Sequence, residues 1–180
     1  LFYGAGDPRA LPSFPPRRSS DRLSPEIGGP PVFPVQPKGL YEETGQSEPG
    51  NSNFHWKDSA GEGRYRKSIY TYWKRMLLHP SLAAFDGPSR QVCLAKRSIT
   101  NTPRQALVTL NDPIFHDCAQ AFAGRITSAR ETVDARSQFA FELCLSRPPD
   151  PGERNRFREF VRNGGKDRWL PLATVLLNLD

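Results

Sequence analysis

Prolines and glycines are concentrated in the first third of the chain, and this distribution constrains the fold more than any other feature. Ten of the 18 prolines and nine of the 14 glycines lie in the first 65 positions. Proline lacks a backbone N–H and fixes φ, and glycine loses the most entropy on ordering, so both disfavour regular helices and central strands. The folded core must therefore come mainly from the residues after Tyr65.

The proline-rich stretch 23–63 predicts an extended arm. Prolines at positions 30, 31, 34 and 37 favour a polyproline-like conformation, so the apolar residues between them need no strand partner. We expect this arm to lie on the domain, and a disordered linker is the alternative. Residues 13–21 (SFPPRRSSD) resemble the translation of a sequencing-adapter oligonucleotide, so we expect residues 1–22 to be a non-native or disordered leader.

The net charge of +6 is a feature of many nucleic-acid-binding proteins. Basic and acidic residues are interspersed, however, and residues 23–180 carry 21 basic and 17 acidic side chains, a net +4. Only one local basic cluster occurs, with aromatic residues between its members, which are Arg64, Arg66, Lys67, Lys74 and Arg75. We therefore expect no nucleic-acid partner. No apolar run approaches the roughly 20 residues that cross a bilayer, and no signal peptide is visible.

The residues that usually carry catalysis or bind metals show no recognisable spacing. Cys93, Cys118 and Cys144 form no C-x-x-C pair, which excludes a local zinc ribbon and a c-type haem attachment site. Three buried thiols are the simpler prediction, and one disulfide with a free thiol is the alternative. The three histidines are scattered, and no phosphate loop, dinucleotide fingerprint or Gly-x-Ser-x-Gly elbow occurs. We predict no catalytic residue, no metal site and no cofactor in residues 1–180.

Residues 64–76 (RYRKSIYTYWKRM) can be read as a helix or as a strand. Apolar residues recur at helical spacing, but the alternation of β-branched and aromatic residues favours a strand. Pro80, Gly87 and Pro88 interrupt the sequence that follows, and residues 91–99 are a second candidate for a short extended piece.

Helix start signals dominate from Asn101 onward. Thr102 and Gln105 have the spacing of a capping box around Pro103, which predicts a helix that buries three apolar residues, Ala106, Leu107 and Leu110. Asp112 and Pro113 predict the next helix start, followed by an apolar stripe made of Phe115, Cys118, Phe122 and Ile126.

Three further helices are predicted towards the C-terminus. Ser128 should cap the first, with an apolar stripe of Val133, Phe139, Ala140, Leu143 and Cys144. Asp150 should cap the second, which buries Phe157, Phe160 and Val161, and Gly164-Gly165 should supply a left-handed exit. The last helix begins near Arg168 and should be the central element of the unit, with an apolar side formed by Trp169, Leu172, Val175, Leu176 and Leu179. The fold class is therefore mainly α, a compact bundle of about five short helices over residues 64–180, with one or two short strands.

A series of motifs runs in order along residues 23–180. They are 27–30 (IGGP), 37–40 (PKGL), 65–75 (YRKSIYTYWKR), 85–90 (FDGPSR), Arg97, 100–107 (TNTPRQAL), 110–113 (LNDP), 145–148 (LSRP) and 176–180 (LLNLD). This series resembles the C-terminal domain of the large cytochrome-associated proteins of planctomycetes, domain of unknown function 1553. The resemblance implies a module of an exported cell-envelope protein, and it also implies that the helical domain is truncated at its C-terminus. The partners of this module would be the upstream domains of the same polypeptide or envelope proteins, and haem would be bound only in an upstream cytochrome domain.

Two groups of side chains are candidates for ligand binding. Asp86, Arg90, Arg97, Asn101 and Asp112 could form a pocket for an anion or a sugar, although helix capping and loop fixation explain the same residue types. Tyr70, Tyr72 and Trp73, with Lys74 and Arg75, could stack on sugar rings or bases, although half-buried packing is the more common role. We expect a non-catalytic structural or interaction module, and the alternative is an enzymatic or carbohydrate-binding cleft around Asp86, Arg90, Arg97 and Asp112.

Overall fold

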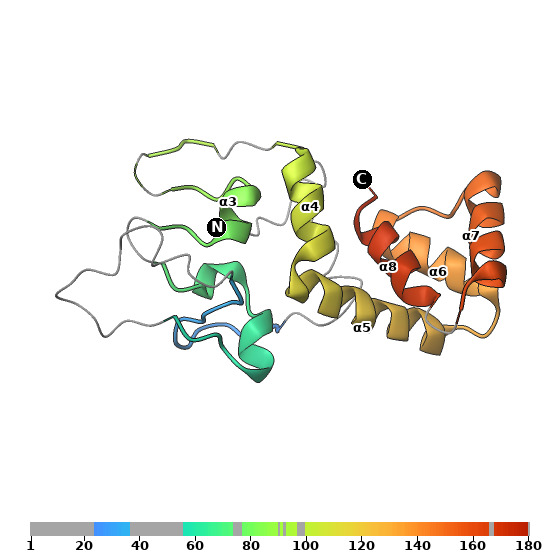
Figure 1. Cartoon of the computed structure of the whole chain (residues 1–180), viewed down its shortest axis with the longest axis horizontal. Helices are drawn as coiled ribbons and strands as arrows, with labels where there is room; N and C mark the ends of the chain where they lie inside the picture. The colour runs from blue at the N-terminus through green and yellow to red at the C-terminus, as the bar shows by residue number, and fades with distance from the viewer. Residues whose placement is uncertain are drawn as a thin grey trace. The chain divides into compact units, whose positions relative to one another are not determined.

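The computed structural model describes residues 24–36, 56–73, 77–89, 91, 93–96, 100–165 and 168–179 of the chain. The fold of this described part is mainly helical, which confirms the predicted class (Figure 1). Two 3-10 helices come first, η1 (Gly61–Tyr65) and η2 (Ser68–Tyr70). The α-helices follow in chain order as α3 (Pro80–Ala84), α4 (Pro103–Asn111), α5 (Pro113–Ala129), α6 (Val133–Leu145), α7 (Pro151–Asn163) and α8 (Trp169–Leu177).

The chain divides into two compact units. One is Ser24–Thr100, which holds the proline-rich arm, the two 3-10 helices and α3, and the other contains Asn101–Asp180 with helices α4 to α8. Each unit is described below by itself.

The strand predicted in residues 64–76 is wrong for the residues that the structure describes there. The end of η1 and the whole of η2 lie in this segment, and a single parallel bridge joins Thr71 to Val32 of the arm. The N–H of Val32 donates to the Tyr70 carbonyl at 2.8 Å, and the Val32 carbonyl accepts from Tyr72 at 2.7 Å. The next arm positions that would extend a parallel ladder are Pro30 and Pro34, which have no N–H to donate. The bridge therefore cannot grow into a strand pair.

Pro80 begins a helix instead of interrupting one. It is the first residue of α3, where proline loses no needed donor and its fixed φ suits the helix. In the segment predicted to be extended, the described residues 91 and 93–96 form no strand, and the other members lie outside the described residues.

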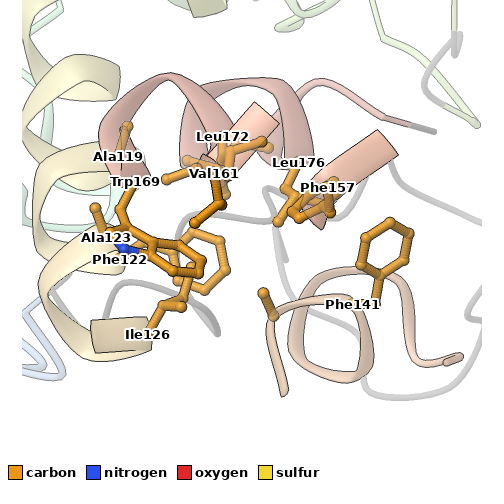
Figure 2. Close-up of a cluster of buried hydrophobic side chains, with 13 residues drawn as sticks. Ala119, Phe122, Ala123, Ile126, Phe141, Phe157, Val161, Trp169, Leu172 and Leu176 are labelled. Carbon is orange, nitrogen blue, oxygen red and sulfur yellow. The ribbon is translucent and has the colours of Figure 1, made fainter. Parts of the chain in front are cut away.

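Buried side chains from four helices form the core of the second unit, as Figure 2 shows. Phe122 and Ile126 of α5 are fully buried, as is Leu176 of α8. Phe141 of α6 meets Phe157 of α7 edge to face, with ring centroids 5.2 Å apart. Helix α8 packs against both α5 and α6 and buries Trp169, Leu172, Ala173, Leu176 and Leu177. It is not the single central element that was predicted, because α5 and α6 each pack against three helices.

Helix α4 does not bury the residues expected from its pattern. Leu107 and Leu110 are 60% and 52% exposed, Ala106 is also exposed, and the polar Gln105 is buried. The inward side of α4 is set by polar contacts instead, because Thr109 hydrogen-bonds to the Asn178 side chain beyond the end of α8. The prediction that these three apolar residues are core residues is therefore wrong.

Smaller departures from the predicted apolar stripes occur in α6, α7 and α8. Phe141 and Ser137 are buried on α6, while Phe160 of α7 and Val175 of α8 are 44% and 50% exposed. These two outward positions arise because a short helix buries only the side that its neighbours cover.

The predicted left-handed exit at Gly164-Gly165 is also wrong. Gly164 ends α7 with φ −80° and ψ 153°, an extended conformation open to any residue. A Cβ at Gly164 would lie 2.8 Å from the Cβ of Arg168 and 3.0 Å from the Phe160 carbonyl oxygen, so close approach of the chain explains the glycine. The left-handed helix end belongs to α6, where Ser146 has φ 56°.

Candidate functional site

The polar residues predicted to form a pocket are placed in separate parts of the described structure. Asp86 lies in the unit Ser24–Thr100, whereas Asn101 and Asp112 belong to the second unit. Arg90 and Arg97 lie outside the described residues. The geometry of each described member therefore has to be considered within its own unit.

Asp86 fixes the loop that follows α3. Its Oδ2 atom accepts two hydrogen bonds from Thr100, from the backbone N–H at 2.8 Å and from the hydroxyl at 2.7 Å. Asp86 has φ 56°, a left-handed conformation that aspartate tolerates better than most residues. The carboxylate thus joins two positions 14 residues apart, which is a structural use of the group.

Asp112 and Thr102 hold the starts of two helices. The Asp112 carboxylate accepts from the backbone N–H of Ile114 at 2.9 Å and caps α5. Thr102 and Gln105 form a capping box at the start of α4, in which the Gln105 side chain accepts from the Thr102 N–H at 3.0 Å. These groups satisfy backbone donors that helix ends leave open.

Ser128 does not cap a helix, so that prediction is wrong. Helix α5 continues through Ala129, and the Ser128 hydroxyl donates back to the Arg125 carbonyl at 3.2 Å. Thr132 caps α6 instead and accepts from the Ala135 N–H at 3.3 Å. Both Ser128 and Thr132 are good capping residues, and Arg136 of α6 stabilises the longer α5 because its guanidinium donates to the Thr127 carbonyl in the last turn at 2.9 Å.

Asp150 caps α7 together with Glu153. The two residues form a capping box, with Glu153 N–H donating to the Asp150 carboxylate at 2.7 Å and Asp150 N–H donating to the Glu153 carboxylate at 2.8 Å. Arg147 forms a bidentate ion pair with the same Glu153 carboxylate, in which both N···O distances are 2.7 Å. These contacts lower the pKa of Glu153 from its ordinary 4.5 to about 2, chiefly through the Arg147 hydrogen bonds.

A second ion pair joins α6 to α7. Arg158 donates to both carboxylate oxygens of Asp134, and its hydrogen bonds lower the pKa of that carboxyl. An open surface depression on α7 is lined by Arg158 together with Asn155, Glu159 and Arg162. This arrangement resembles a solvated helix face more than a catalytic cleft, because all four residues come from one helix.

Tyr70 holds the arm in place within its unit. Its hydroxyl accepts from the Gly28 N–H at 2.6 Å, and the Arg66 guanidinium lies 4.2 Å from the centre of its ring. Arg66 also donates to the carbonyl oxygens of Gly28 and Pro30. Trp73 is half-buried. Of the three residues predicted to stack on sugars or bases, Tyr70 therefore already contacts the arm, and so does Tyr72, whose ring stacks on Phe33.

An aromatic cluster in the same unit was not identified from the sequence. The ring of Phe33 stacks on Tyr72 at 5.0 Å and meets Trp56 edge-on at 5.2 Å, and His79 lies 6.0 Å from Trp56. The available signal was the apolar Val-Phe pair between prolines of the arm, which requires aromatic or apolar neighbours if the arm lies on the domain.

The cysteines and possible metal ligands do not form a reactive centre in the described part of the chain. The three cysteines, all of them described, form no disulfide, and they are buried at Cys118, half-buried at Cys144 and exposed at Cys93, so the prediction of three buried thiols is wrong for Cys93. Among the described residues, no group of three or more His, Cys, Asp or Glu could hold a metal ion. No helix in this described part is long and apolar enough to cross a membrane.

Comparison with known proteins gives one match. No curated protein and no solved structure matches the chain. The family model PSD1, described as a protein of unknown function (DUF1553), matches residues 17–161. Because this match spans most of the 180 residues and the predicted resemblance points to the same domain, the chain belongs to the PSD1 (DUF1553) family.

Proposed function

We propose that the chain is a non-catalytic interaction module of a larger exported polypeptide, in which it binds the companion domains. The observation that supports this proposal is the outward face of α4. Leu107 and Leu110 are 60% and 52% exposed on a nine-residue helix whose buried residue is the polar Gln105. Positions 106, 107 and 110 lie on one side of a helix, so the exposed apolar atoms are contiguous.

Burial of the outward face of α4 by a companion domain would stabilise the complex between them. Full burial of one leucine side chain is favourable by roughly 1.5–3 kcal/mol. Because Leu107 and Leu110 are both more than half exposed, a partner that covers them gains much of this burial free energy on binding. Contiguous apolar patches on otherwise polar surfaces are typical of protein interfaces.

The described polar candidates support a non-catalytic role. Asp86 binds Thr100, Asp112 caps α5, and Tyr70 binds the arm, so each of these groups already stabilises the fold. A catalytic site needs groups whose hydrogen-bonding capacity is directed at a substrate.

The context of this proposal comes from the family resemblance. We infer that the larger polypeptide is a cell-envelope protein with a cytochrome domain, and that haem is bound in that domain and not in this module. The partners would then be upstream domains of the same polypeptide.

The test is a binding measurement between this 180-residue chain and the upstream domains of its full-length polypeptide, by isothermal titration calorimetry. The double variant L107S/L110S should weaken binding at least about tenfold, as truncation of central interface residues does. Val175→Ser is the matched control, because Val175 is 50% exposed on α8 and should leave binding unchanged. Absence of binding by the unmodified chain, or equal binding by the double variant, would contradict the proposal.

A further inference from the structure

Residues 24–36 are the described first part of the stretch 23–63 that was predicted to be an arm, and they alone are called the arm from here on. They lie against a set of side chains that we call the arm groove: Trp56, Ser59, Arg66, Tyr70, Tyr72 and His79. Trp56 and Ser59 belong to the predicted arm stretch but contact residues 33 and 34 as part of the groove. All of the groove residues belong to the unit Ser24–Thr100, and they approach the arm from 22 to 44 positions further along the chain. The groove therefore contacts the arm as a separate segment, in the way that a protein contacts a bound peptide.

The groove recognises carbonyl groups of the arm. The Trp56 indole N–H donates to the Pro34 carbonyl at 3.0 Å, and Nε2 of the buried His79 lies 3.3 Å from the Val35 carbonyl. Since a carbonyl only accepts, this contact requires the proton on Nε2 of His79. Arg66 donates to the Pro30 carbonyl at 3.2 Å. Proline offers an acceptor but no donor, so a groove that supplies donors suits a proline-rich segment.

One arm side chain anchors the contact. Phe33 is held between the rings of Tyr72 and Trp56, with centroid distances of 5.0 and 5.2 Å. Both backbone groups of Phe33 hydrogen-bond to Ser59. The Phe33 N–H donates to the Ser59 hydroxyl at 2.9 Å, and the Phe33 carbonyl accepts from the Ser59 N–H at 2.8 Å. Phe33 therefore contributes an aromatic anchor and two backbone hydrogen bonds.

Two glycines define where the recognised segment begins. Gly28 and Gly29 have φ of 86° and 95°, which other residues rarely adopt. A Cβ at Gly29 would also lie 3.2 Å from Nη1 of Arg66. The groove thus suits the sequence of residues 28–35, GGPPVFPV, over other proline-rich sequences.

We propose that the arm groove is a binding site for a proline-rich segment, and that the arm of a second copy of this chain can occupy it in exchange for the chain's own arm. Docking into an aromatic-lined groove is the general mode by which proteins bind proline-rich peptides, whose limited flexibility lowers the entropy lost on binding. Here the indole N–H of Trp56 adds a donor to that surface. Exchange of an identical element between copies needs no new contact, since every interaction is already made within one chain. The proposal concerns the unit Ser24–Thr100, so its failure would leave the proposal for α4 unaffected.

The first experiment separates the arm from the groove after folding. A protease site is introduced at residues 45–50 of the full chain, the folded protein is cleaved there, and a fluorescent peptide of residues 24–36 is added. Fluorescence anisotropy should show saturable uptake of this peptide. A peptide with Phe33→Ala should bind at least about tenfold more weakly, as loss of an aromatic anchor does. Ile27→Ala is the matched control, because Ile27 is 84% exposed, and its peptide should bind like the unmodified one.

No uptake, or equal uptake of the Phe33→Ala peptide, would overturn the proposed groove. A second measurement covers the case in which the cleaved chain unfolds. The uncleaved F33A chain should show a thermal midpoint that rises with added unmodified peptide, because a ligand that binds the folded state stabilises it. A midpoint that does not move would contradict the proposal.

The exchange between copies has its own test. Two differently tagged full chains are mixed at about millimolar concentration, where intermolecular binding can compete with a tethered arm, and then diluted. Capture of one tag should retain the other, and the F33A substitution in both chains should abolish this retention. If the peptide binds but no mixed pair forms, the exchange is refuted while the groove stands.

Discussion

The guanidinium of Arg147 donates two hydrogen bonds, each 2.7 Å long, to the two carboxylate oxygens of Glu153. This pair joins the chain just after α6 to the first turn of α7, across the two prolines between them. The Arg147 guanidinium also lies 5.5 Å from the centre of the Phe141 ring, so the ion pair sits beside the core. The same Glu153 carboxylate completes the capping box with Asp150. One carboxylate therefore both caps the start of α7 and binds Arg147, which follows α6.

The first prediction concerns the acid stability that Glu153 contributes. Its pKa is about 2 in the folded protein against an ordinary 4.5, so its contribution is fully present above about pH 4.5 and is lost as the pH falls towards 2. E153Q keeps a side-chain acceptor for Asp150 but cannot ionise. The difference in unfolding free energy between the unmodified chain and E153Q should therefore shrink between pH 4.5 and 2. Urea unfolding followed by Trp169 fluorescence in a W56F/W73F background measures it, and a pH-independent difference would contradict it.

Asp86 should protect the amide of Thr100 from hydrogen exchange. D86G allows the positive φ but removes the acceptor, and it should accelerate Thr100 exchange about tenfold, the equivalent of about 1.4 kcal/mol. D86N keeps both an acceptor oxygen and tolerance of the left-handed conformation, so its effect should be smaller. Amide exchange by NMR provides the measurement. Equal exchange in D86G and the unmodified chain would show that the Asp86–Thr100 contact is not formed in solution.

Ser146 is a position where a substitution should stabilise the protein. It is exposed and ends α6 with φ 56°, a conformation that costs a residue with a Cβ roughly 1–2 kcal/mol. S146G should raise the unfolding free energy by about 0.5–1 kcal/mol, after the greater backbone entropy of glycine in the unfolded chain is deducted. S146A keeps the Cβ and serves as the control, which should show no gain. A destabilised S146G variant in chemical denaturation would refute the assignment of this helix end.

Phe122 and Leu110 should respond very differently to truncation. Phe122 is fully buried in the core, and F122A should cost about 3–5 kcal/mol in unfolding free energy. Leu110 is 52% exposed on α4, and L110A should change stability by no more than about 0.5 kcal/mol. Thermal unfolding followed by circular dichroism compares the two variants. A large loss in L110A would mean that α4 buries its leucines after all.

Local signals in the sequence predicted where several helices start. Thr102 with Gln105, and Asp150 with Glu153, are three residues apart, so the contacts that they make are determined by the helix turn itself. Ser128 shows the limit of this reasoning. Thr132 offers an equally suitable cap four residues later, and packing of the end of α5 decided between them.

The candidate site was predicted less well than the fold. Residue types identified Asp86, Asp112 and Tyr70 as polar or aromatic groups of interest, and the structure gives each of them a role in the fold. Trp56 and His79 were missed because their importance arises from contacts with arm residues 22 and 44 positions away. No periodicity in the sequence reports such distant pairs.

The sequence by itself determined that the described part of the chain is mainly helical, where most of its helices begin, and that the prolines of residues 24–36 disfavour a regular strand. Capping, proline geometry and 3.6-residue periodicity act over a few residues, so these features are visible in the sequence. Only the tertiary structure decided that Leu107 and Leu110 point outward, that Val32 forms a single bridge, and that the arm occupies an aromatic groove. Burial and pairing depend on which surfaces meet in space, and these surfaces come from segments far apart in the chain.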